Sequence, residues 1–194
     1  PRAVSMPRYE VKDVDGFVSR GICEAQDPTR LTSYSFPPEK EPDWGYFPEE
    51  KVEFKPFRYV NSQKLIQTEE SGRLPIRLQA GEWAVVDFEQ LEVGFLRFAA
   101  EAEENAEVIL AFTEYVEEPP FSFTRMNAQN VIEYHIPKYK QLQAESFEPY
   151  SFRQVIVLVK RGSIRLESVG FRTFERPMEG ARELPLSDPQ LAGI

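Results

Sequence analysis

The stretch Phe152–Lys160 (FRQVIVLVK) decides the fold class of this chain. Its centre, Val155–Val159, is an unbroken run of five aliphatic residues. Five residues are too few for a membrane-spanning helix, which needs about 20. A strand with this pattern is apolar on both faces, as is typical of a central strand covered on each side. The stretch therefore predicts a buried strand in the middle of a sheet.

The preceding apolar stretch, Glu107–Val116 (EVILAFTEYV), has the alternation of a strand that faces a core. Val108, Leu110 and Phe112 occupy every second position and form one clearly apolar face. A period of two is the spacing at which side chains return to the same side of a strand. This pattern predicts a second strand beside the first.

The following stretch, Ser163–Phe174, changes phase along its length. Its apolar positions begin at Ile164 and Leu166 and then shift by one residue. One extra residue in a strand produces such a shift, so we expect a β-bulge near Ser168–Gly170. The intervening Arg161-Gly162 predicts a tight hairpin to the strand before it.

Further strand candidates share short apolar or β-branched runs bounded by turn residues. They are Val52–Val60, Lys64–Thr68, Arg73–Leu78, Glu82–Phe88, Val93–Ala102, Asn130–Ile136 and Gln143–Glu148. About ten short strands at this spacing are typical of an all-β chain. We therefore predict a β-sandwich, jelly-roll-like in topology.

Three regions differ in composition. Residues 1–50 combine frequent prolines with aromatic residues, which predicts an extended N-terminal arm lying on another surface. Residues 51–175 hold the sandwich, and residues 176–194 are a linker and the start of a following helical domain. In the last region Ser187 or Asp188 is a candidate helix cap, with Pro189 in the first turn. The chain then stops within five residues of Pro189, so we expect a longer parent polypeptide.

Charge and cysteine content exclude several classes of function. The 194 residues carry a net charge of −9, with no basic cluster that would bind nucleic acid. A single cysteine, Cys23, excludes an internal disulfide and a cysteine-based zinc site. We see neither a membrane segment nor a signal peptide, and a lone reduced thiol favours the cytoplasm.

The sequence contains no recognisable catalytic, metal-binding or cofactor-binding motif. His135 is the only histidine, and no second His or Cys stands near it in the sequence. Asp13 and Asp15 lie in a DVDG turn, but the later ligands of a calcium loop are missing. We expect no catalytic residue, no metal and no cofactor in this chain.

Aromatic residues are the remaining candidates for a binding surface. Sugars stack their C–H faces on aromatic rings and bind polar side chains through their hydroxyls. The candidate carbohydrate-binding residues are Trp83, Glu114, Tyr115, Phe121 and Phe123. Packing of these rings on the arm or on a neighbouring domain is the alternative interpretation.

Three motifs resemble the β-sandwich that precedes the catalytic barrel of bacterial α-L-rhamnosidases in glycoside hydrolase family 78. They are Asp87–Phe98 (DFEQLEVGFLRF), Val108–Glu114 (VILAFTE) and Phe147–Val155 (FEPYSFRQV). The matching positions are Asp87, Phe88, Gly94, Phe95, Arg97, Glu114, Phe147, Pro149, Phe152 and Arg153. Glu89 stands where the family usually has Gly, and Ser187–Leu191 looks like the family's entry into its (α/α)6 barrel.

The resemblance implies a non-catalytic accessory domain of a larger rhamnosidase-like enzyme. Its partners would be a catalytic (α/α)6 domain in the same parent chain and rhamnose-containing saccharides. The family's catalytic carboxylates lie on the barrel, so none is assigned here. We expect Asp87, Arg97, Glu114 and Arg153 to form an ionic network that joins strands.

Two other functions remain compatible with the same strand pattern. One is a stand-alone carbohydrate-binding module with an aromatic platform. The other is a structural interaction domain that binds a protein partner and no sugar.

Overall fold

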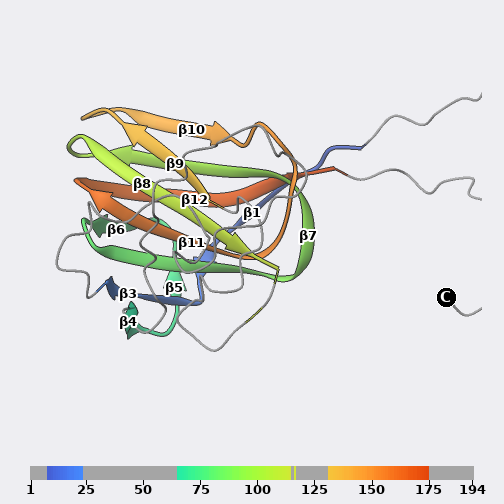
Figure 1. Cartoon of the computed structure of the whole chain (residues 1–194), viewed down its shortest axis with the longest axis horizontal. Helices are drawn as coiled ribbons and strands as arrows, with labels where there is room; N and C mark the ends of the chain where they lie inside the picture. Colours follow the sequence, from blue (N-terminus) through green and yellow to red (C-terminus); the bar gives the residue numbers. More distant parts are fainter. Residues whose placement is uncertain (1–7, 24–64, 115, 117–130, 175–194) are drawn as a thin grey trace, which may run out of the picture.

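The computed structural model describes residues 8–23, 65–114, 116 and 131–174. These residues form twelve strands and no helix (Figure 1). The strands are β1 (Val11–Val14), β2 (Gly16–Phe17), β3 (Ser19–Cys23), β4 (Leu65–Glu69), β5 (Gly72–Arg73), β6 (Ile76–Gln79), β7 (Glu82–Ala102), β8 (Ala106–Thr113), β9 (Val131–Ile136), β10 (Gln141–Glu145), β11 (Tyr150–Arg161) and β12 (Ser163–Thr173). The predicted all-β fold class is confirmed.

β7 is one strand of 21 residues where the sequence predicted two. It pairs with β11 on both sides of a bend, first through Trp83–Asp87 and then through Glu92–Gly94. The register shifts between these two sets of pairs, and Glu89 lies in the bend with a left-handed φ of 68°. The polar residues Glu89 and Gln90 break the apolar pattern of the sequence, but the strand continues through them. Figure 1 shows the bend at the right-hand end of the molecule.

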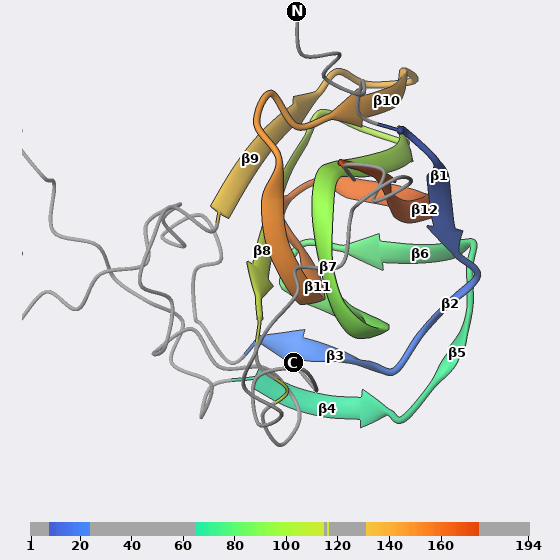
Figure 2. The same cartoon turned by 90° about the vertical axis from the view of Figure 1, so that its right-hand side faces the viewer.

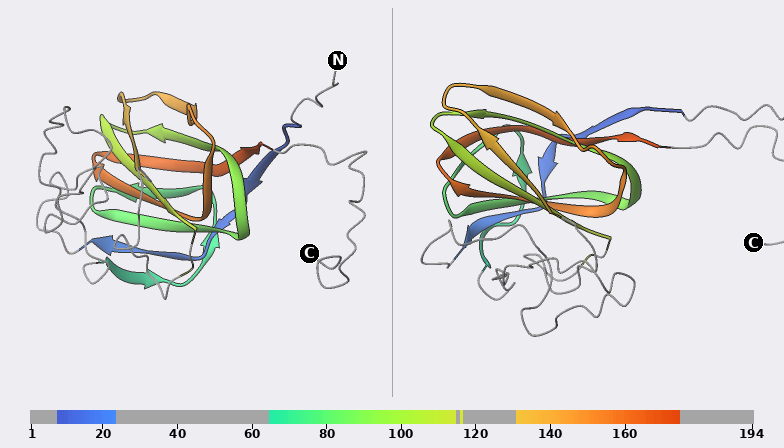
Figure 3. Two further views of the ribbon diagram at one scale, coloured as in Figure 1. Left: turned by 45° about the vertical axis from the view of Figure 1, so that its right-hand side comes forward. Right: turned by 45° about the horizontal axis from the view of Figure 1, so that its top comes forward.

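The bend divides one curled antiparallel sheet of ten strands into two layers. The β11 layer contains β9, β8, β11, the first half of β7, β3 and β4 in this order. The β12 layer contains β10, the second half of β7, and β12, whose outer edge pairs with β1 and β6. β2 and β5 form a separate pair at the side. This arrangement is consistent with the predicted β-sandwich (Figure 3).

The predicted hairpin at Arg161-Gly162 is wrong. β11 and β12 pair with different segments of β7 and lie in different layers, so their connection is an arch between layers. Gly162 has a φ of 73°, and a Cβ there would collide with the Asn105 carbonyl oxygen. The glycine is required by this close approach, and a glycine turn by itself does not specify which strands pair.

The predicted bulge in β12 is present close to its expected place. The register against β7 shifts between Leu166 and Ser168, so the extra residue is Glu167. Leu166 and Val169 consequently both point into the core and are 0% exposed. The shift of apolar phase in the sequence correctly located this irregularity to within one residue.

The main core lies between the two layers. Phe88, Phe152 and Phe171 meet there, with ring centroids 5.1–5.4 Å apart. Alternate residues of β11 face this core, whereas Ile156 and Leu158 face the opposite side and belong to a second apolar cluster. Both faces of β11 are therefore buried, as its sequence predicted.

Part of the predicted N-terminal arm belongs to the sandwich. β1 pairs with β12, β3 pairs with β4 and β7, and Phe17 between them is buried in the main core. These strands occupy the proline-free stretch between Pro7 and Pro28, so no missing N–H prevents pairing. Three other predicted regions lie outside the described residues. They are residues 1–7 and 24–50 of the arm, the candidate strand Val52–Val60, and residues 176–194.

Candidate interaction surface

Trp83, the first predicted sugar-binding residue, is fully buried. It lies near the start of β7, is 0% exposed, and packs in the second apolar cluster with Leu158 and Val85. Its indole Nε1 is buried without a hydrogen-bond partner. A buried ring has no free face on which a sugar could stack, so Trp83 is not part of an exposed platform. The uninterrupted apolar run Trp83–Val86 was the signal for burial.

Glu114 follows the last residue of β8 and is exposed. Tyr115, Phe121 and Phe123 lie outside the described residues. Glu114 and Trp83 are not brought together, because Trp83 lies level with Ile109 of β8 across β11, five residues before Glu114. A sugar-binding role for Glu114 and the three aromatic residues remains a prediction.

The predicted ionic network is divided between the two layers. Asp87 and Arg153 do meet, with 3.3 Å between Oδ1 and Nε. Asp87 also accepts hydrogen bonds from the Gln154 side chain at 2.8 Å and from the Glu89 backbone N–H at 2.7 Å. The donors from Arg153 and Gln154 join β11 to β7, and the donor from Glu89 holds β7 to itself at the bend. The role of Asp87 is therefore to stabilise the bend.

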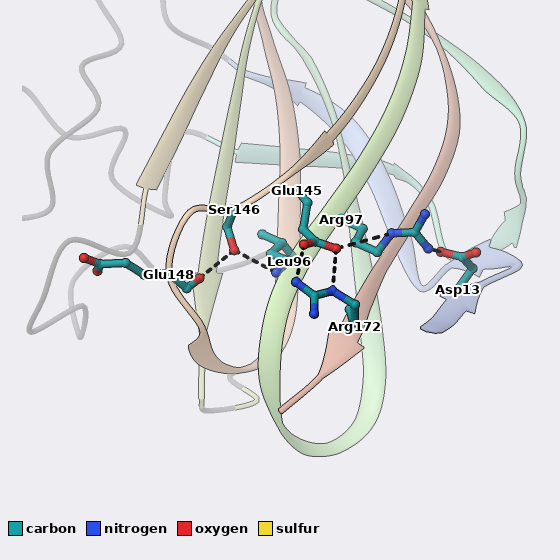
Figure 4. Close-up of polar contacts among 7 residues, drawn as sticks. All are labelled: Asp13, Leu96, Arg97, Glu145, Ser146, Glu148 and Arg172. Atoms are coloured by element: carbon teal, nitrogen blue, oxygen red, sulfur yellow. Dashed lines mark hydrogen bonds and ion pairs between the residues drawn. The ribbon is translucent and has the colours of Figure 1, made fainter. Parts of the chain in front are cut away.

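Arg97 makes its contacts elsewhere, on the outer face of the β12 layer. Its guanidinium lies 3.4 Å from Asp13 of β1 and 4.0 Å from Glu145 of β10 (Figure 4). Arg172 of β12 reaches the same Glu145 carboxylate and donates from Nε at 3.0 Å. Four strands thus contribute to one ionic cluster, which consists of Asp13, Arg97, Glu145 and Arg172. The sequence motif contained Arg97 but gave no sign of its partners.

The electrostatics of this ionic cluster fix its charge state. The hydrogen bond from Arg172 lowers the pKa of Glu145 despite the opposing effect of burial. The same bond raises the pKa of Arg172. Glu145 therefore stays ionised at neutral pH and cannot donate a proton to a substrate. The cluster joins β1, β7, β10 and β12 through charged contacts.

Aromatic rings flank Arg172. Its guanidinium carbon is 4.4 Å from the ring centroid of Phe95 and 4.7 Å from that of Tyr9. Phe174 completes the group, with ring centroids 5.8 Å from Phe95 and 6.1 Å from Tyr9. Cation–π contacts of this kind hold a planar guanidinium in place. The sequence did not reveal Tyr9 as a partner, because the pairing of β1 with β12 is needed to bring it there.

Ser146 fixes the connection from β10 to β11 beside this cluster. Its Oγ accepts a hydrogen bond from the Leu96 N–H at 2.9 Å and donates one to the Glu148 carbonyl at 2.7 Å (Figure 4). Between these anchored residues the Phe147 side chain is 96% exposed. An exposed phenylalanine on an anchored turn is a candidate contact for another surface.

Two further types of site are absent from the part of the chain that the structure describes. It contains no helix that is long and apolar enough to span a membrane. It contains no group of three or more His, Cys, Asp or Glu side chains arranged to hold a metal ion.

Comparisons with known proteins find the likeness in structure and not in sequence. No family model matches the chain, and no curated protein matches it. A rhamnosidase from Klebsiella oxytoca, solved with rhamnose bound, aligns with a TM-score of 0.51 at 16% identity over 96% of this chain. A family GH78 rhamnosidase from Bacillus sp. GL1 aligns at 20% identity over 63% of this chain and 13% of its own, with a TM-score of 0.46.

The Klebsiella alignment shows the fold. This chain has the fold of one part of that rhamnosidase and spans 33% of its length. The resemblance read from the three sequence motifs is therefore confirmed at the level of fold.

Proposed function

We propose that this chain is a non-catalytic accessory β-sandwich of a larger α-L-rhamnosidase-like glycoside hydrolase. It packs against a catalytic (α/α)6 domain and helps to shape a site for rhamnose-containing saccharides. The observation that carries the proposal is the unequal coverage of the Klebsiella match, 96% of this chain against 33% of the rhamnosidase. The remaining two thirds of such a polypeptide would hold the catalytic carboxylates.

The positions of the motif residues support this proposal independently. Asp87 and Arg153 stabilise the bend of β7, and Arg97 joins β7 to β1 and β10. Gly94 lies where a Cβ would collide with the Arg172 carbonyl oxygen of the neighbouring strand. Four of the residues that carry the resemblance, Asp87, Gly94, Arg97 and Arg153, thus have structural roles in the sandwich. Such a role is expected of a scaffold domain whose chemistry lies elsewhere.

The first test compares the native polypeptide with this chain. We expect a native mass several times the 22.5 kDa of this chain, measured on the protein purified from its source. We also expect the longer polypeptide, and not this chain alone, to hydrolyse an aryl α-L-rhamnoside. A native mass of 22.5 kDa, or turnover by this chain alone, would contradict the proposal.

A stand-alone carbohydrate-binding module is the second candidate. It is favoured by the half-exposed Tyr9 ring beside Arg172, which Glu145 holds in place, because sugar sites combine a ring with fixed polar groups. Calorimetric titration of this chain with L-rhamnose separates the two candidates. Saturable binding that Tyr9→Ala abolishes and Tyr139→Ala preserves would favour the module. The accessory domain predicts no saturable binding by this chain alone.

A further inference from the structure

Several solvent-exposed apolar side chains lie at the end of the sandwich where β7 bends. We call this group the bend-end patch; it consists of Tyr9, Leu91, Val93, Phe147 and Phe174. Their exposed fractions are 48%, 56%, 47%, 96% and 43% respectively. The bend of β7, the β10–β11 connection and the end of β12 lie together at this end (Figures 1 and 3), and Figure 2 looks onto it.

The bend-end patch is held in place by the structure around it. The Phe174 backbone N–H donates to the Val93 carbonyl at 3.3 Å, and the Tyr9 ring lies against Phe174. Ser146 anchors the turn that carries Phe147, and Asp87 anchors the bend that carries Leu91. The exposure of these side chains is therefore fixed by pairing and hydrogen bonds. Exposed apolar patches of this kind on a fixed surface mark interaction sites.

The opposite end of the sandwich has a different character. Its turns contain Gly81, Asn105 and Gly162, and the exposed Tyr139 has the Lys138 ammonium 4.6 Å from its ring centroid. Tyr139 donates its backbone N–H to Ala102, the last residue of β7, far along that strand from the bend. This end provides an internal reference surface for the bend-end patch.

Charge defines the surroundings of the patch. The cations Lys12, Arg97 and Arg172 are already engaged with carboxylates of Glu92, Asp13 and Glu145. Glu89 and Glu148, which are exposed beside Leu91 and Phe147, have no ion pair within the described ranges. The patch therefore has an apolar centre with an acidic margin. A complementary surface is apolar with Arg or Lys around it.

We propose that the bend-end patch is the docking surface for a domain linked to this one through the residues that follow Phe174. This inference rests on the proposed function and names its interface. Phe174 belongs to the patch, so the polypeptide that continues from it is tethered there at high effective concentration. The chain also spans only 33% of the rhamnosidase whose fold it shares. The docked surface is apolar, with basic residues at its margin.

Hydroxyl-radical footprinting with mass-spectrometric readout tests this inference on the longer polypeptide and on this chain. In the longer polypeptide we expect the oxidation of Phe147 and Leu91 to fall to the level of buried Phe152. In this chain alone both residues oxidise readily, in keeping with their exposure. Tyr139, at the opposite end, reacts equally in both samples. Equal reactivity of Phe147 and Leu91 in both samples would overturn the docking surface.

Matched variants of the longer polypeptide give a second readout. Phe147→Ser with Leu91→Ser removes the apolar centre, and Tyr139→Ser with Ile66→Ser removes exposed apolar side chains elsewhere. We expect only the first pair to speed proteolytic release of the sandwich, with neither pair changing the melting temperature of this chain alone. Equal release rates for the two pairs would contradict the docking surface.

The two proposals fail in distinguishable ways. A native mass of 22.5 kDa removes the proposed function and this inference with it. A longer polypeptide in which Phe147 and Leu91 stay reactive leaves the proposed function standing and removes the docking surface alone. Protection that rises with the concentration of this chain by itself would assign the patch to a second copy and overturn the linked-domain proposal.

Discussion

The two layers of the sandwich bury their outer faces very differently. In the β11 layer, Ile156 and Leu158 point away from the main core and are still no more than 1% exposed. In the β12 layer, the outward residues include Arg97 and Arg172, which are ion-paired and partly exposed. The β11 layer is thus held by apolar burial on both faces, and the β12 layer by burial on one face and charge on the other. We infer that truncating outward residues costs more stability in the β11 layer than in the β12 layer.

The largest expected effect comes from truncating an outward residue of the β11 layer. Leu158→Ala should lower the free energy of unfolding by about 2–5 kcal/mol. Leu158 is 1% exposed, so removing most of its side chain leaves a cavity in the second apolar cluster. Urea denaturation measures the change. The matched variant Arg165→Ala, outward on β12 and ion-paired with Glu167, should change it by less than about 0.5 kcal/mol. Equal effects of the two variants would remove the distinction between the layers.

A smaller effect of opposite sign is expected at the bend that joins the layers. Glu89 has a φ of 68°, a conformation that costs a non-glycine residue roughly 1–2 kcal/mol. Glu89→Gly should therefore raise the free energy of unfolding by about 1 kcal/mol. The neighbouring variant Gln90→Gly, at an exposed position outside the left-handed region, should lower it by about 0.5–1 kcal/mol. Destabilisation by Glu89→Gly would show that the bend does not carry this strain.

The smallest effect is expected from the ionic cluster on the outer face of the β12 layer. Glu145→Gln should lower the free energy of unfolding by no more than about 0.5 kcal/mol at pH 7, because the carboxylate is partly exposed and screened. Unfolding in urea at low and at high salt measures the loss. A loss as large as that of Leu158→Ala would mean that charge, and not burial, holds this layer.

The pH dependence of this loss follows from the lowered pKa of Glu145. Its stabilising contribution is present above the pKa of the unfolded chain, about 4.3. The contribution disappears as the pH falls through the lower pKa of the folded state. The difference between wild type and Glu145→Gln should therefore shrink towards zero in acid. A difference that grows as the pH falls would reverse the sign of this interaction.

Local patterns in the sequence predicted most of the described strands. The alternation in Glu107–Val116 and the apolar run Val155–Val159 both correspond to buried strands. Patterns of this kind succeed because they reflect which face of a strand is buried, a property of neighbouring residues alone. The β12 bulge was found for the same reason. The residues from Val11 to Cys23 were assigned to the arm because the prolines on either side outweighed a short strand signal.

Pairing partners were the part that local patterns did not predict. The Arg161-Gly162 turn was expected to close a hairpin, but both flanking strands pair with β7 in different layers. A turn sequence fixes the backbone over a few residues, whereas the choice of partner depends on the packing of the whole core. The exposure of the candidate site residues likewise depends on the packing of the whole core. Trp83 was chosen for its ring, and its burial is decided by strands distant in sequence.

The all-β class, the position of the central strand β11 and the resemblance to a rhamnosidase β-sandwich could be predicted from the sequence, and the structural comparison confirms the resemblance at the level of fold. These follow from periodicity and from short motifs, which are local in the chain. The bend of β7 across both layers and the place of Arg172 between Tyr9 and Phe95 depend on the folded arrangement of the strands. That arrangement also decides which aromatic side chains are exposed at the bend end. The physical reason is that pairing and burial depend on contacts between residues far apart in the sequence, and no local pattern encodes those contacts.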